Sequence, residues 1–135
     1  MSQSVIYTVN SSAQNVAVNG TINLGTVVRK FGPNLNLSGN AVQVAGNGYY
    51  KITTSITLAP SAVGNVTVTA YKDSVAIPGA VATEAITAAN NPANLSIIAV
   101  FREPCSCCEG ISNITYVLTG TAASVTNIAS VVEKL

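Results

Sequence analysis

The sequence predicts an all-β protein whose antiparallel strands pack as a β-sandwich, and three observations support this prediction. Apolar and polar residues alternate along several segments, which places successive side chains on opposite faces of a strand. Turn-forming pairs such as Asn19-Gly20, Pro78-Gly79 and Glu109-Gly110 recur at short intervals. Hydrophobic residues make up 48% of the 135 residues and charged residues only 8%, the opposite of the balance in disordered chains.

Four segments alternate clearly enough to be predicted as half-buried strands of antiparallel sheets. In chain order they are residues 16–24, 49–58, 65–71 and 113–119. Counting segments between turns predicts eight to ten strands. Residues 74–89 are rich enough in alanine to admit a helical turn, although a Pro-Gly pair interrupts them. No linker, charge run or long repeat divides the sequence, so we predict a single domain over residues 1–135.

Two segments are apolar on both faces, residues 95–101 and, nearly so, residues 5–7. Such a strand either lies centrally or buries its second face against another subunit, and we predict the subunit because so few charges leave little to keep a free monomer soluble. The closing strand, residues 125–132, is the second candidate. The predicted subunit-contact residues are Leu95, Ile97, Ile98, Val100, Phe101, Val125, Ile128 and Val132.

Several partners and locations are excluded by composition. The six basic residues are scattered singly or in one pair, whereas a nucleic-acid footprint needs a basic stripe. No apolar run reaches the length of about 18 residues that a membrane span requires. Residues 1–5 lack a basic region followed by an apolar run, so we predict no signal peptide. We expect synthesis in the cytoplasm and release, if any, by a route such as cell lysis.

The most unusual local feature is a group of three cysteines, Cys105, Cys107 and Cys108, in a predicted loop between Pro104 and Gly110. A metal site would need separated Cys or Cys/His pairs, and the sequence has no His. Copies around a symmetry axis could pool their thiols, so a shared metal stays an alternative. A catalytic thiol would lack a base. We favour free thiols or cross-links between subunits, because an odd count leaves one cysteine unpaired within a monomer.

The remaining side chains do not form a catalytic pattern. No two carboxylates share a strand face at a spacing suited to a glycosidase, so we predict a protein that is not an enzyme and has no cofactor. Tyr49 and Tyr71 are candidates for a sugar-binding surface because aromatic rings stack on sugar faces. Tyr50 and Tyr116 lie on the apolar faces of their strands and are expected in the core.

Residues 48–52, Gly-Tyr-Tyr-Lys-Ile, follow a Gly-rich turn and resemble the G-x-Y-x-[aromatic or aliphatic] signature of the tumour-necrosis-factor and complement globular-head superfamily. Residues 5–24, 66–79 and 113–132 are similar to strands of its bacterial and phage members. The resemblance implies a ten-stranded jelly-roll that forms a compact homotrimer. The sequence departs from the family in its thin aromatic core, with two Phe and no Trp, and in lacking the collagen-like Gly-X-Y stalk of spore-surface knobs.

Three functions follow from this resemblance. Members without a stalk or signal peptide are often phage virion components, so the first hypothesis is a homotrimer that decorates or stabilises a virion surface by contacting a capsid or tail protein. The second is a receptor-binding head that recognises a host surface glycan. The third is a subunit of a spore-surface or extracellular fibre, cross-linked through the cysteine loop. All three place the protein on a virion or extracellular surface.

Overall fold

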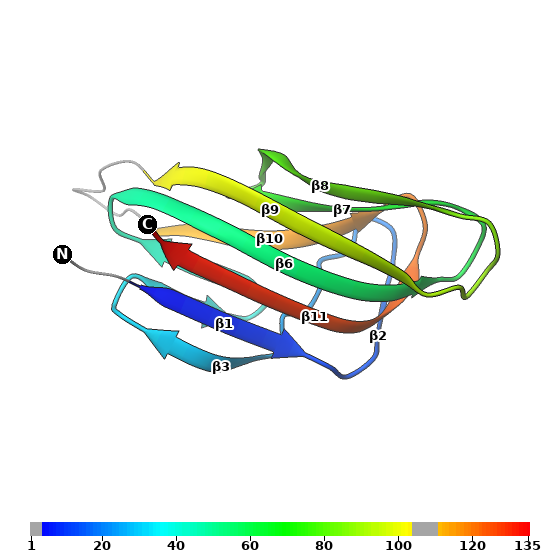
Figure 1. The fold of residues 1–135 in the computed structure, drawn as a ribbon, viewed down its shortest axis with the longest axis horizontal. Coiled ribbons are helices and arrows are strands. Elements are labelled where there is room, and N and C mark those ends of the chain that lie inside the picture. Colours follow the sequence, from blue (N-terminus) through cyan, green and yellow to red (C-terminus); the bar gives the residue numbers. More distant parts are fainter. Residues whose placement is uncertain (1–3, 104–110) are drawn as a thin grey trace.

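The computed structural model describes residues 4–103 and 111–135, which form two antiparallel sheets packed face to face as a sandwich (Figure 1). The strands are β1 (Val5–Asn10), β2 (Gln14–Val16), β3 (Thr26–Phe31), β4 (Leu35–Ser38), β5 (Ala41–Ala45), β6 (Gly48–Pro60), β7 (Gly64–Lys72), β8 (Val75–Ile86), β9 (Ala93–Glu103), β10 (Ile111–Thr119) and β11 (Ala123–Lys134). The all-β prediction is confirmed. The helical turn admitted for residues 74–89 is wrong, because β8 occupies most of that segment.

In both sheets, the order of the strands differs from their order along the chain. Sheet A has the order β3-β1-β11-β6-β9, with β2 also paired to β11, and sheet B has the order β4-β5-β10-β7-β8. Consecutive strands β5 and β6 lie in different sheets, as do β8 and β9 and also β10 and β11. The chain therefore passes repeatedly between the layers, and β9 and β8 become neighbouring edge strands of the two sheets.

The core lies between the sheets and follows from the alternation in the sequence. Residues at every second position of β6, β7 and β10 are buried, as predicted for residues 49–58, 65–71 and 113–119. The segment 16–24 is only partly the predicted strand, since β2 ends at Val16 and a single bridge joins Thr21 to Val117. Val18 faces solvent at 46% exposure, whereas Ile22 and Leu24 are buried.

A cluster of hydroxyl groups ties the two sheets together inside this core. The hydroxyl oxygen of Tyr116, from sheet B, lies 2.7 Å from Thr54 Oγ1 and 3.0 Å from Ser130 Oγ, both from sheet A. Thr54 also donates to Ser130 at 3.3 Å. Burial raises the pKa of Tyr116 above its ordinary 10.0, although the hydrogen bonds to Ser130 and Thr54 oppose the shift. The cluster thus satisfies polar atoms that would otherwise be costly to bury.

The ends of the described chain lie together at one end of the sandwich, where Figure 1 marks N and C. The backbone N–H of Lys134 donates to the carbonyl of Ser4 at 2.8 Å. The β7–β8 hairpin turns at the same end through Asp73 and Ser74, which have φ values of 50° and 70°. Two residues with positive φ are what a tight hairpin turn with the native strand twist requires.

Candidate assembly surface and adjoining pocket

The outward face of sheet A carries exposed apolar side chains at its edge strand. On β9, Ile98 is 65% exposed and Val100 is 52% exposed. Cross-strand register continues the surface over Thr53 and Val131 to Tyr7, in the order Ile98–Thr53–Val131–Tyr7. We call this surface the A face. Thr53 is the polar member of this row, and exposed apolar side chains gathered on one face often mark interaction sites.

The structure divides the predicted subunit-contact residues into two groups. Ile98 and Val100 point outward and belong to the A face. The other six side chains point inward and are buried between the sheets, so they are core residues rather than contact residues: Leu95, Ile97, Phe101, Val125, Ile128 and Val132. The physical reason is that odd-numbered residues of β9 take the inner positions of the pleat, which leaves only the even-numbered set for another subunit.

The outward face of sheet B differs in chemistry. On β7 and β8, Thr67 and Thr83 are cross-strand neighbours whose hydroxyl oxygens lie 3.0 Å apart. Further along the same face come Thr69, Thr115 and Asn113. We call this surface the B face. Val81, the register partner of Thr69, is 49% exposed among them. The hydroxyl and amide groups of this face would lose hydration under an apolar partner.

The two tyrosines predicted as a sugar-binding surface do not come together. Tyr49 lies on β6, on the A face side, and is 55% exposed. Tyr71 lies on β7, half-buried on the B face side. Because the two faces point in opposite directions, these rings cannot contact the same sugar within one chain.

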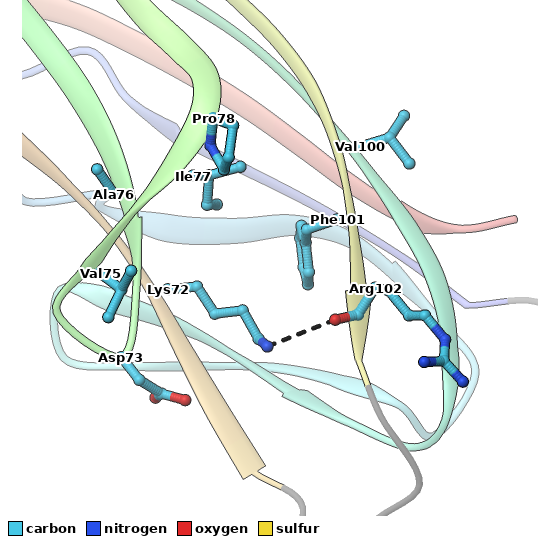
Figure 2. A pocket seen from close by; sticks show the side chains of 9 residues that line it. All are labelled: Lys72, Asp73, Val75, Ala76, Ile77, Pro78, Val100, Phe101 and Arg102. Carbon is cyan, nitrogen blue, oxygen red and sulfur yellow. Dashed lines mark hydrogen bonds between the residues drawn. The ribbon is translucent and has the colours of Figure 1, made fainter.

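A pocket of about 470 Å³ opens beside the A face, between the β7–β8 hairpin and the end of β9. Its walls are mostly apolar and include Val75, Ile77, Pro78 and Phe101. Figure 2 shows Phe101 directed between the two edge strands, whereas the side chains of Val100 and Arg102 point away from the hairpin. Strand β9 therefore contributes mainly backbone and Phe101 to the pocket, which the sequence alone did not indicate.

A buried carboxylate, Glu103, is paired with Lys72, which lines the pocket. Glu103 is 3% exposed and accepts hydrogen bonds from the hydroxyl of Ser112, with oxygen–oxygen distances of 2.8 and 2.9 Å. The ammonium of Lys72 lies 3.5 Å from Glu103 and donates to the carbonyl of Arg102 at 3.4 Å. Burial, and secondarily the charge of Glu103, raises the pKa of Tyr50 above 10.0. The carboxylate is thus paired and fixed in place, like a structural ion pair.

The position of Glu103 follows from the topology. It ends β9, where the start of β10 brings Ser112 to it and the end of β7 brings Lys72. Cys105, Cys107 and Cys108 lie outside the described residues. Among residues 4–103 and 111–135, no group of three His, Cys, Asp or Glu side chains could hold a metal ion.

The topology also separates the charges, which was not evident from the sequence. In the described chain, the basic and acidic residues cluster at the end of the sandwich where the chain ends lie, through the ends of β3, β7, β9 and β11 and the start of β6. We call it the charged end. The exception is Glu84 on β8, whose register partner Val66 lies near the start of β7, so this carboxylate lies toward the opposite end. We call the opposite end the neutral end; four segments there, residues 11–25 with the short strand β2, 61–63, 87–92 and 120–122, contain no charged residue.

No protein-family model matches the chain, and no curated protein matches it. Solved structures do match it. The Eiger TNF from S. frugiperda is 13% identical with a TM-score of 0.67, covering 98% of this chain and 91% of that one. The globular domain of the zebrafish complement 1qA protein is 8% identical with a TM-score of 0.68, covering 97% and 95%. The PRD1 vertex protein P5 is 15% identical with a TM-score of 0.64, covering 97% and 95%.

These likenesses extend over nearly the whole length of both partners in each comparison, but the identities are too low to show more than the fold. Within the described residues, no helix is long and apolar enough to cross a membrane. The strand orders of the two sheets and the structural neighbours agree with the arrangement that residues 48–52 predicted. The chain is an antiparallel β-sandwich with the jelly-roll fold of the tumour-necrosis-factor and complement heads.

Proposed function

We propose that this chain is a non-enzymatic structural protein, a homotrimeric jelly-roll that decorates or stabilises the surface of a phage virion. The observation that carries the proposal is the A face, where Ile98 and Val100 remain exposed although the same strand completes the core with its other side. An edge strand with apolar residues on both faces is a hazard in a free monomer. Covering by a sister subunit removes that hazard.

The physical gain from covering the A face is hydrophobic. Burial of apolar surface contributes roughly 25 cal/mol per Å², and β-branched side chains such as Ile98 and Val100 lose little rotamer freedom on association. Among the described residues, Lys51 on β6 and Glu133 on β11 lie opposite each other on the A face toward the charged end, and Lys51 is also the register partner of Val100. Arg29 is the register partner of Tyr7 at the β3 side of the face, so the row without a described charge is Ile98, Thr53 and Val131.

A virion location is supported by one structural neighbour, whose name is that of a vertex protein. A passive role is supported by the site chemistry. In the part of the chain that the structure describes, Glu103 is already held by Ser112 and Lys72. The glycan-binding alternative loses support because Tyr49 and Tyr71 lie on opposite faces. The fibre alternative depends on cysteines outside the described residues.

The trimer is tested by the mass of the full chain in solution, with reductant present. We expect three copies of the 13.7 kDa chain in sedimentation equilibrium. Ile98→Asp should convert the trimer to monomer because it places a charge in the covered apolar surface. Val81→Asp is the matched control, since Val81 is also a β-branched residue on an edge strand, 49% exposed on β8 of sheet B. A monomeric wild-type chain would overturn the trimer.

The virion role needs a separate measurement. Particles purified from the strain that encodes the chain should contain it in a fixed ratio to the major shell protein, and recombinant chain should bind particles that lack it. Ile98→Asp should bind more weakly if only the trimer is recognised. Absence of the chain from purified particles would overturn the virion role and leave the trimer untouched.

A further inference from the structure

The neutral end carries two exposed valines and, beside them, a recess in the surface. Val63, in the β6–β7 loop, is 65% exposed, and Val18, in the segment after β2, is 46% exposed. Beside them lies a recess of about 410 Å³. Its lining is composed of small residues, among them Ala17, Ala59 and Ala122, together with Ser and Asn side chains.

Projection and recess lie on the same surface. Ser61 and Ala122 line the recess and are joined by a backbone hydrogen bond of 2.9 Å, and Val63 lies two residues beyond Ser61 in the same loop. A surface that carries both a knob and its hole is self-complementary, and a two-fold axis lets each copy place its knob in the hole of the other. This geometry favours a second copy of the chain over an unrelated protein.

The distribution of charge also favours a second copy of the chain as the partner. The four segments of the neutral end have no charged residue, and the described charge on that side is Glu84 on β8, whose register partner is Val66. Two neutral ends that meet through these four segments desolvate no charge within them. Two charged ends would repel, because basic residues outnumber acidic ones among the described residues there. The neutral-end loops also contain no aromatic residue, which removes the stacking that a sugar partner would use.

We propose that the neutral end binds the neutral end of a second copy of this chain, so that assemblies join in pairs across a two-fold axis. The contact uses Val18 and Val63 as knobs and the alanine-lined recess as the hole. It does not depend on the trimer, since the A face and the neutral end are separate surfaces. A trimer would pair to a hexamer, and a monomer would pair to a dimer.

The test is native mass spectrometry and sedimentation equilibrium of the full chain over a range of concentrations, with reductant present. We expect hexamer in exchange with trimer, with a dissociation constant that changes little between low and high salt because no charges meet. Val63→Glu should raise this dissociation constant by roughly 30-fold or more, as loss of a central contact residue does. Val18→Glu should also raise this dissociation constant. Because Val18 lies in a different segment, agreement between the two variants would show that the effect is not confined to the β6–β7 loop.

Ile111→Glu is the matched control, because Ile111 is 56% exposed at the charged end of β10. It should leave the hexamer intact. Trimer alone at every concentration would overturn the end-to-end contact and leave the trimer standing. Exchange between monomer and dimer that Val63→Glu abolishes would support the contact and overturn the trimer. Equal effects of Val63→Glu and Ile111→Glu would overturn the proposed surface.

Discussion

The A face and the B face are built from the same secondary structure but differ in what their outward residues can do. Both face away from the core. Sheet A has six strands and sheet B has five, and the third strand in the order is β11 in sheet A and β10 in sheet B. The A face presents aliphatic side chains such as Ile98 and Val131, whereas the B face presents threonines such as Thr69 and Thr115.

The two faces differ in the polarity of side chains that have nearly the same shape. Valine and threonine have the same branched outline and the same preference for strands, so exchanging one for the other hardly disturbs the sheet. The exchange does change whether the outward surface is better covered or better hydrated. A two-sheet sandwich can therefore direct assembly to one of its faces without altering the fold.

The largest expected effect comes from a charge at the centre of each face. Val131→Lys, on β11, should raise the trimer dissociation constant by about 100-fold or more, because burying an unpaired ammonium costs several kcal/mol. Thr115→Lys, on β10, occupies the equivalent third strand of sheet B and should leave assembly unchanged. Sedimentation equilibrium of both variants measures the contrast. Equal weakening by both lysines would mean that the faces do not differ in function.

The next effect concerns the hydroxyl cluster that joins the sheets behind the two faces. Tyr116→Phe removes a hydroxyl within hydrogen-bonding distance of Thr54 and Ser130. It should lower the free energy of unfolding by about 1–3 kcal/mol, because buried partners lose a hydrogen bond. Tyr71→Phe, on the B face, should change it by no more than about 0.5 kcal/mol. Urea unfolding distinguishes them, and similar losses would remove any special role from the cluster.

The third effect is the response to alkaline pH. Burial raises the pKa of Tyr116 and of Tyr50 above the ordinary 10.0. Unfolded chains then lose these protons at lower pH than folded chains, so stability is unaffected well below pH 10.0 and falls as the pH rises above it. Melting temperatures should fall less steeply with pH in Tyr116→Phe than in the wild type. Parallel slopes would contradict coupling of this ionisation to unfolding.

The smallest effect is at the hairpin that begins β8 of sheet B. Asp73 accepts a hydrogen bond from the N–H of Asn113 at 2.9 Å and adopts a positive φ of 50°. Asp73→Asn keeps both features and should be neutral within about 0.5 kcal/mol. Asp73→Ala should cost about 1 kcal/mol, measured by thermal unfolding, with the trimer mass unchanged. A loss of assembly in Asp73→Ala would instead connect this end of sheet B to the subunit contact.

In strands with one apolar face, the side chains that face the core were predictable from the sequence. Along β6, β7 and β10, only one of the two alternating sets is apolar, so the pattern determines which side chains face the core. The jelly-roll arrangement came from the resemblance of residues 48–52, because alternation indicates strands but not the order in which they pair.

For strands that are apolar on both faces, the sequence did not predict which side chains face the core. Along β9 both alternating sets are apolar, and nothing in the sequence says that Phe101 faces inward and Val100 outward. Along β11 the register shifts between Val125 and Asn127, so the buried positions change from odd to even numbers. A bulge of this kind has no reliable signature in a single sequence, and the contact surface was consequently drawn too large. The charge separation depends on which strand ends meet, which only the topology reveals.

The hydrogen bond between Lys134 and Ser4 has a practical consequence for display. Because both ends of the described chain leave the sandwich side by side, a peptide or fluorophore joined to either one would be carried on the charged end. The loops at the opposite end would stay uncovered by such a label. A closed chain, made by joining the neighbouring ends with a short linker, should keep the same sheets and could be opened again at an exposed loop to present cargo in the other direction.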